Sequence, residues 1–346
     1  MLKIKYFLWL VIPFLISCSD EDEQYVDVPL DFTVPSNFPD LTYNIDGNRP
    51  TEKGFELGKK LFYDGRLASD GLVSCGFCHL QANAFTHHGH TVSHGVGDAL
   101  GTRNAPPIQN MAFQSFYMYD GAAENLDLQP IIPLTSVIEM NGNLNTILKM
   151  MKEDKEYQKL FGQAFEDKAI TTENMLKALS QFMVMMVSSN SKFDKYRRNE
   201  TGGTFSSDEL AGYNLFKSKC ASCHATDLMT DNSFRNNGLA VNPKVNDVGR
   251  YKVTEVVSDY YKFKVQSLRN VEVSAPYMHD GRFSTLEAVL NHYASGVNDS
   301  PTLDPILKQN GRLGIELSDT EKKQIITFLK TLTDTQYLTD KRFSEF

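Results

Sequence analysis

Cys75-Gly76-Phe77-Cys78-His79 and Cys220-Ala221-Ser222-Cys223-His224 are two copies of one pattern, C-x-x-C-H, and together they use four of the five cysteines in the chain. Two thiols at this spacing can both bond to the vinyl groups of one porphyrin, and the adjoining histidine can then ligate its iron. A structural zinc site or a redox disulfide would explain the cysteine pairs, but not the histidine that follows each pair. The pattern therefore predicts two covalently attached haem c groups, with His79 and His224 as the proximal ligands.

The length and composition allow one haem in each of two domains. The chain has 346 residues, and the second motif begins 145 residues after the first. With 41% hydrophobic and 23% charged residues, it has enough apolar material for two buried cores. The net charge of −8 argues against a nucleic-acid partner.

Helical patterns recur in the two halves. Gly58-x-x-Leu61-Phe62 matches Gly212-x-x-Leu215-Phe216, and each lies in a predicted helix that leads into a haem motif. Thr51 and the capping box Ser206 to Glu209 begin these helices, and glycine at positions 54 and 58 allows another helix to approach closely. Further helices are predicted over residues 171–186 and from the capping box Ser318 to Glu321. We therefore expect a mainly α fold with two cytochrome c-type domains, residues 46–200 and 201–346, joined by a hinge at 199–204.

The N-terminal residues predict export and lipidation. Lys3 and Lys5 precede an apolar run over residues 6–16 that is too short to span a bilayer, which indicates a signal peptide over residues 1–17. The run ends in Leu-Ile-Ser-Cys18, which resembles the lipobox of bacterial lipoproteins; the alternatives are an uncleaved anchor and a free Cys18 thiol. Residues 18–45 are then a lipidated tether and linker. This predicts a cell-envelope lipoprotein at the periplasmic face or outer-membrane surface of a Gram-negative bacterium, with membrane contact only through the lipid.

An ordered series of motifs between about Gly54 and Leu332 resembles the bacterial dihaem cytochrome c peroxidases, including their MauG-like branch. Besides the haem motifs, the series consists of Gly101 to Pro106, Tyr119-Asp120-Gly121, Gln129, Glu139-Met140, Ser267 to Val271 and Ala275 to Gly281.

The resemblance implies that the first haem is the peroxidatic site. Peroxide chemistry needs an open iron position and a group that moves a proton from the near oxygen to the far one, so that water can leave. The family pattern assigns this role to Glu139 and the orientation of the peroxide to Gln129. The alternative is that Glu139 is a surface carboxylate and Gln129 a loop amide.

The sixth ligand of the first haem stays open. In many peroxidases of the family, a histidine in the following loop blocks this iron until reduction releases it, and His94 lies within one residue of that position. The loop also contains His87, His88 and His90. MauG-like members leave the iron open, and the loop could instead be polar surface.

The resemblance places Tyr293 at the sixth position of the second haem, as in MauG-like members. A hard phenolate stabilises oxidised iron, whereas the methionine of other members raises the potential. Met278 and His292 are competing candidates, and a purely structural tyrosine is a further alternative.

Two further roles follow from the resemblance. Tyr119 stands where the family usually has a tryptophan that relays electrons between the haems. Asn104, Ser274 and Pro276 match a calcium site between the domains, where an amide oxygen and backbone carbonyls suit a hard cation. Serine replaces the usual threonine at position 274.

Three functions are consistent with these residues. The first is a dihaem c peroxidase that reduces hydrogen peroxide to water with electrons from a small periplasmic cytochrome c or cupredoxin. The second is a MauG-like oxidase that uses peroxide-derived high-valent iron to oxidise a protein or organic substrate, and the third is a non-catalytic dihaem electron carrier. Gln129 and Glu139 argue against the carrier, while Tyr293 favours the oxidase. A homodimer is compatible with all three.

Overall fold

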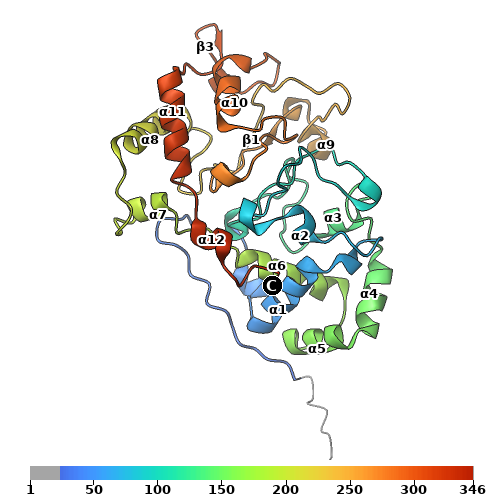
Figure 1. Ribbon diagram of the computed structural model, residues 1–346. Coiled ribbons are helices and arrows are strands. Elements are labelled where there is room, and N and C mark those ends of the chain that lie inside the picture. Colours follow the sequence, from blue (N-terminus) through green and yellow to red (C-terminus); the bar gives the residue numbers. More distant parts are fainter. Residues whose placement is uncertain (1–23, 346) are drawn as a thin grey trace, which may run out of the picture.

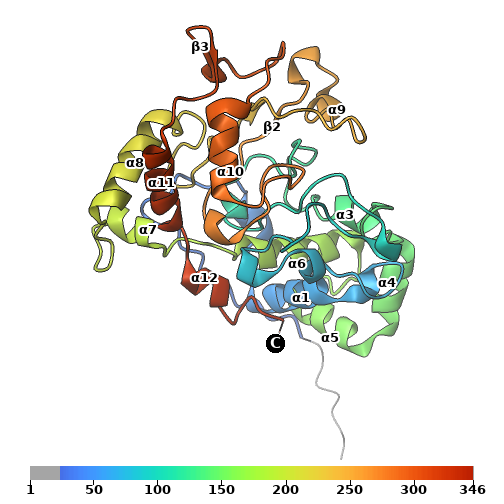
Figure 2. The same cartoon turned by 45° about the horizontal axis from the view of Figure 1, so that its top comes forward.

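The computed structural model describes residues 24–345, and this part of the chain is mostly helical (Figures 1 and 2). The predicted signal peptide, Cys18 and the acidic residues 19–23 lie outside the described residues. Within the described range, no helix combines the length and apolar character needed to cross a membrane.

The helices divide between the part of the sequence that contains the first haem motif and the part that contains the second. They are α1 (Glu52–Tyr63), α2 (Cys75–Cys78), α3 (Ile131–Thr135), α4 (Leu144–Glu153), α5 (Lys155–Ala164) and α6 (Thr172–Val184), followed by α7 (Lys192–Arg197), α8 (Ser207–Lys219), α9 (Tyr251–Thr254), α10 (Leu286–Asn291), α11 (Asp319–Lys330) and α12 (Thr335–Thr339). Two antiparallel strand pairs join β1 (Phe234–Arg235) to β2 (Phe263–Lys264) and β3 (Lys308–Gln309) to β4 (Arg312–Leu313). Short 3-10 turns and one π turn, η8 (His292–Gly296), connect them.

Helices α1 and α6 form the central pair of the first part. The Thr51 side chain accepts a hydrogen bond from the backbone N–H of Gly54 and caps α1 as predicted. A Cβ atom added at Gly58 would lie 2.0 Å from the carbonyl oxygen of Ala178 on α6. The predicted close approach at Gly58 is therefore confirmed, since any side chain there would push the helices apart.

Helices α8 and α11 repeat this arrangement in the second part. Both predicted capping boxes are present, at Ser206 and Ser318. A Cβ atom added at Gly212 would lie 1.9 Å from the carbonyl oxygen of Gln324 on α11. Gly58 and Gly212 therefore occupy equivalent positions, as the matching sequence around them indicates.

One buried cluster consists mostly of residues before 200 and another mostly of residues after it, but several residues pack in the cluster of the other part. Phe193 of α7 packs in the second cluster with Phe216 and Phe328. Tyr337 and Phe343, near the C-terminus, pack in the first cluster, so α12 lies against the first part (Figures 1 and 2). Residues 183–186, which include three methionines, are buried.

The segment over residues 24–45 has irregular structure, as predicted for a linker, but it is fixed to the protein. The Asn37 amide donates hydrogen bonds to Asp194 at 3.1 Å and to Asp227 at 3.0 Å. The Phe38 ring packs on Phe113 with centroids 5.2 Å apart. Residues 24–45 therefore pack against both halves of the protein.

Candidate active site and the neighbouring haem pocket

The first haem motif presents two thiols and one imidazole to a cavity. Ser74 caps α2 by accepting a hydrogen bond from the N–H of Phe77, which sets Cys75 and Cys78 one turn apart. The His79 imidazole pairs through Nδ1 with the carbonyl oxygen of Phe85 at 2.6 Å. With Nδ1 donating, Nε2 is the nitrogen that can ligate iron. Burial lowers the pKa of His79 and so favours the neutral, ligating form.

The second motif has the same construction. The His224 Nδ1 pairs with the carbonyl oxygen of Met229 at 3.1 Å, and burial lowers its pKa. The four motif cysteines are free of disulfides. Burial raises the pKa of Cys75 and of Cys220 to about 12. Each motif therefore offers two free thiols and one oriented neutral histidine beside a cavity, which is the donor set that covalent haem c requires.

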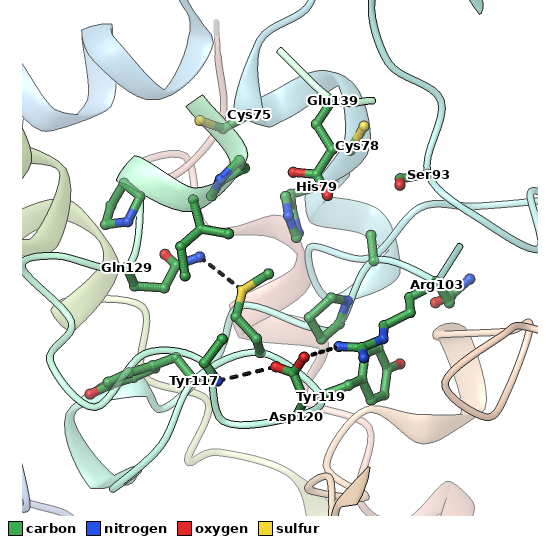
Figure 3. A pocket seen from close by; sticks show the side chains of 18 of the residues that line it. Cys75, Cys78, His79, Ser93, Arg103, Tyr117, Tyr119, Asp120, Gln129 and Glu139 are labelled. Atoms are coloured by element: carbon green, nitrogen blue, oxygen red, sulfur yellow. Dashed lines mark hydrogen bonds and ion pairs between the residues drawn. The ribbon is translucent and has the colours of Figure 1, made fainter. Parts of the chain in front are cut away.

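The first cavity has a volume of about 660 Å³ and brings Gln129 and Glu139 together with Cys75, Cys78 and His79. Gln129 and Glu139 reach into it from different segments (Figure 3). Burial raises the pKa of Glu139. The Gln129 amide nitrogen lies 3.4 Å from the sulfur of Met118. Both side chains are partly exposed, and both line the cavity that also contains the proximal histidine.

The histidine loop, residues 87–94, ends against the segment that carries Glu139. Val96 donates a backbone hydrogen bond of 2.8 Å to the carbonyl oxygen of Glu139, and a Cβ atom at Gly95 would lie 2.4 Å from the carbonyl oxygen of Ile138. His94 lines the first cavity, with its Nε2 hydrogen-bonded to Nδ1 of His90 at 3.0 Å. His94 would have to release His90 before that nitrogen could ligate iron.

The second cavity has a volume of about 250 Å³, and only two of the three candidate sixth ligands line it. Tyr293 and Met278 line it together with His224, but His292 is not among its lining residues. The His292 Nε2 pairs with the carbonyl oxygen of Asn237 at 3.0 Å, while the amide nitrogen of Asn237 lies 3.5 Å from the Met278 sulfur. Burial raises the pKa of Tyr293, against a hydrogen bond with Asn237 that lowers it. Tyr293 and Met278 therefore remain the candidates that face the cavity.

The two cavities share a wall, which we define as the lining residues common to both: Asn104, Pro107 and Tyr119. Tyr119 is 9% exposed, and burial raises its pKa, while Arg103 acts to lower it. Arg103 forms ion pairs with Asp120 at 2.7 Å and with Asp247 at 2.6 Å. The predicted relay residue thus lies between the two sites.

The three predicted calcium ligands lie on one cavity. Asn104, Ser274 and Pro276 all line the second cavity. The Asn104 amide nitrogen donates to the carbonyl oxygens of His90 and Thr91, both at 3.1 Å, so Oδ1 is on the other side of the amide. Within residues 24–345, no cluster of three or more His, Cys, Asp or Glu side chains forms a metal site. A cation here would depend on amide and backbone oxygens, which suits calcium.

A second internal repeat, not identified in the sequence analysis, shapes both cavities. Tyr117-Met118-Tyr119-Asp120-Gly121 and Tyr277-Met278-His279-Asp280-Gly281 lie 160 residues apart. Met118 and Met278 both adopt a left-handed backbone, with φ of 66° and 73°. Met118 therefore has the same place at the first cavity as Met278 at the second. The signal was the shared Y-M-x-D-G pattern in the sequence.

Comparisons with known proteins agree with this geometry. A family model described as di-haem cytochrome c peroxidase matches residues 52–202. The methylamine utilization protein MauG of Methylorubrum extorquens is 34% identical over 299 residues, covering 85% of this chain and 82% of the relative. The cytochrome c551 peroxidase of Nitrosomonas europaea is 33% identical, covering 81% of this chain and 80% of the relative.

Among solved structures, a MauG-like protein associated with microbial copper homeostasis has a TM-score of 0.81 and 31% identity, covering 91% of this chain and 99% of that one. The matches to these two relatives are long enough to include both haem motifs, and the structural match covers 91% of this chain. The chain belongs to the di-haem cytochrome c peroxidase family and is an oxidoreductase that uses peroxide.

Proposed function

We propose that this protein is a dihaem c peroxidase that reduces hydrogen peroxide to water at the first cavity. Electrons would enter from a small cytochrome c or cupredoxin and pass through the second cavity. The observation that carries the proposal is that Glu139 and Gln129 face the same cavity as His79. A simple electron carrier needs no acid–base pair beside its iron.

Glu139 is the group suited to moving the proton. Haem c bound through Cys75 and Cys78 would supply the iron that binds peroxide and delivers electrons. The Glu139 carboxylate takes the proton from the near oxygen of peroxide and returns it to the far oxygen, so that water can leave. Burial raises the pKa of Glu139, which lets the carboxyl hold that proton between the two transfers.

Gln129 and the proximal histidine would prepare the site. The Gln129 amide nitrogen has only the weak acceptor sulfur of Met118 at 3.4 Å, so a peroxide oxygen can replace it at small cost. The Phe85 carbonyl fixes the His79 ring at 2.6 Å and makes Nε2 a stronger donor to iron.

A MauG-like oxidase is the second candidate, and one observation favours it: Tyr293 lines the second cavity together with His224. A phenolate ligand would lower the potential of the second haem and suit it to storing oxidising equivalents. Tyr119, in the shared wall, would then connect the two haems. Relatives named MauG and relatives named peroxidase match about equally well.

One titration separates these functions. The purified holoprotein is mixed with hydrogen peroxide in its fully ferric and half-reduced forms while absorption spectra and substrate oxidation are recorded. Turnover only after one-electron reduction supports the peroxidase, whereas a reactive ferric form that oxidises an added substrate supports the oxidase. If neither form reacts with peroxide, the result supports the third function, a non-catalytic electron carrier.

Three further assignments belong to the proposal. Cys18 carries the lipid that anchors the protein in the cell envelope, with residues 18–45 as tether and linker; Cys18→Ala should release the protein from the membrane fraction. Calcium binds Asn104, Ser274 and Pro276, which a metal analysis of the holoprotein tests. A homodimer is tested by the mass of the holoprotein in solution.

A further inference from the structure

Lys264 is a buried cation at the boundary of the two sites. It belongs to β2, is 6% exposed and lines the second cavity. Its ammonium group donates to the side-chain oxygen of Gln114 and, at 2.9 Å, to the carbonyl oxygen of Phe116. Both acceptors are uncharged.

The other long basic side chains on this cavity have carboxylate partners. Lys219 pairs with Glu321 at 2.7 Å. Arg235 pairs with Asp231 at 2.7 Å and with Asp304 at 2.8 Å. Among residues 24–345, no carboxylate lies within ion-pair distance of Lys264. A buried charge without a counterion is unfavourable, and burial lowers the pKa of Lys264 to about 7.

We infer that Lys264 binds a carboxylate of the haem attached through Cys220, Cys223 and His224. Haem c carries two propionate groups, and Lys264 lines the cavity in which that haem would lie. The remaining N–H of the ammonium group is available to a propionate, because Gln114 and Phe116 accept only two of three. The inference rests on the proposed second haem, but not on peroxide chemistry.

Lys264 also holds the chain that leads to the relay residue. Its backbone N–H donates to the carbonyl oxygen of Tyr119 at 2.7 Å, and its side chain binds Gln114 and Phe116 in the same segment. One residue would therefore fix both the second haem and Tyr119. A cation beside the haem carboxylate also favours reduced iron, so Lys264 should raise the potential of the second haem.

The test is a potentiometric titration of the full-length holoprotein, followed by absorption spectra of the His224-ligated haem. Lys264→Gln should lower the midpoint potential of that haem. Lys264→Arg, which keeps the positive charge, should have a midpoint potential close to that of the wild type. The control is Lys262→Gln, which removes the same charge at a position two residues before Lys264. The Lys262 side chain is partly exposed and pairs with Asp259 at 3.3 Å. The control should leave the potential unchanged. Haem content is measured separately by the pyridine haemochrome assay, so a missing second haem is distinguished from a wrong role for Lys264.

Equal potentials in Lys264→Gln and Lys262→Gln would overturn the inference. If Lys264→Gln does not fold, resonance Raman spectra of the wild type and Lys264→Arg decide the question, because both keep the charge. Replacing the ammonium by a guanidinium should shift the propionate bending band of the second haem. Identical bands would show that no carboxylate of the haem touches residue 264.

Discussion

The two cavities use the same local construction around the proximal histidine but differ in their other lining residues. His79 and His224 each point Nδ1 at a backbone carbonyl five or six residues later. Gln129 and Glu139 share with His79 a cavity of about 660 Å³, whereas Tyr293 and Met278 share with His224 a cavity of about 250 Å³. The haem motif therefore orients the iron ligand in both cavities, while the other lining residues give each cavity a different set of polar groups.

Removing the proposed proton carrier, Glu139, should abolish most of the reactivity that distinguishes the first cavity from the second. Glu139→Gln keeps the size and polarity of the side chain but removes its base, so we expect the rate of reaction with peroxide to fall by about 10² to 10⁴. Stopped-flow spectra with excess peroxide measure this rate, and the haemochrome assay should still find both haems. Glu124→Gln, which neutralises an exposed carboxylate, is the matched control. Equal rates in the two variants would remove Glu139 from the mechanism.

Replacing Tyr293, the candidate sixth ligand, by methionine should raise the reduction potential of the second haem, so that this haem holds an electron more readily. Tyr293→Met replaces a hard oxygen ligand by a soft sulfur, so we expect the potential of the second haem to rise by roughly 0.1 to 0.3 V, within the range of about 0.8 V that axial ligands span. A spectroelectrochemical titration measures it. Tyr277→Phe, which removes a hydroxyl from a tyrosine on the same cavity, is the control. An unchanged potential in Tyr293→Met would mean that Tyr293 is structural.

The helix pairs beneath the cavities should respond alike to the same change. Gly58→Ala and Gly212→Ala each place a methyl group within 2.0 Å of a carbonyl oxygen on the facing helix. We expect each to lower the free energy of unfolding by about 1 to 3 kcal/mol, the usual cost of overpacking. Thermal unfolding of the holoprotein measures this, with the exposed Asn214→Ala as a control on α8. A loss in only one variant would show that the two pairs are not equivalent.

The smallest expected effect is on the pH dependence of stability. Burial raises the pKa of Glu139 above its usual value of 4.5, so the ionised form is less favourable in the folded state than in the unfolded state. The contribution of Glu139 to the free energy of unfolding is therefore present while the carboxyl is protonated. It is lost as the pH rises through the pKa that Glu139 has in the folded state. Glu139→Gln should therefore raise Tm slightly at pH 8 and have little effect at pH 4. Scanning calorimetry at both values tests this, and a lower Tm at pH 8 would contradict it.

The sequence predicted the features that depend on neighbouring residues. The caps at Thr51, Ser206 and Ser318 and the close approach at Gly58 are present in the structure, because a cap needs only the next three residues and glycine has no side chain to obstruct a helix. The haem motifs are likewise contiguous, and the family resemblance located Gln129 and Glu139 on the first cavity.

Features that depend on distant contacts could not be predicted in this way. His292 was a candidate ligand until the structure showed its Nε2 paired with Asn237, 55 residues away in the sequence. Lys264 carries no motif, and its burial becomes visible only when residues 114–119 lie against β2. The docking of residues 24–45 on both halves includes the hydrogen bonds of Asn37, whose partners lie 157 and 190 residues away.

The return of the C-terminal residues to the first core has a consequence for the order of events during synthesis. Phe343 is 1% exposed, its ring packs near Phe55, and its carbonyl accepts a hydrogen bond of 2.6 Å from the Tyr63 hydroxyl. The first core therefore cannot be completed until residues that follow both haem motifs have emerged. Removal of the chain beyond α12 should leave the first haem, rather than the second, in a loosened pocket.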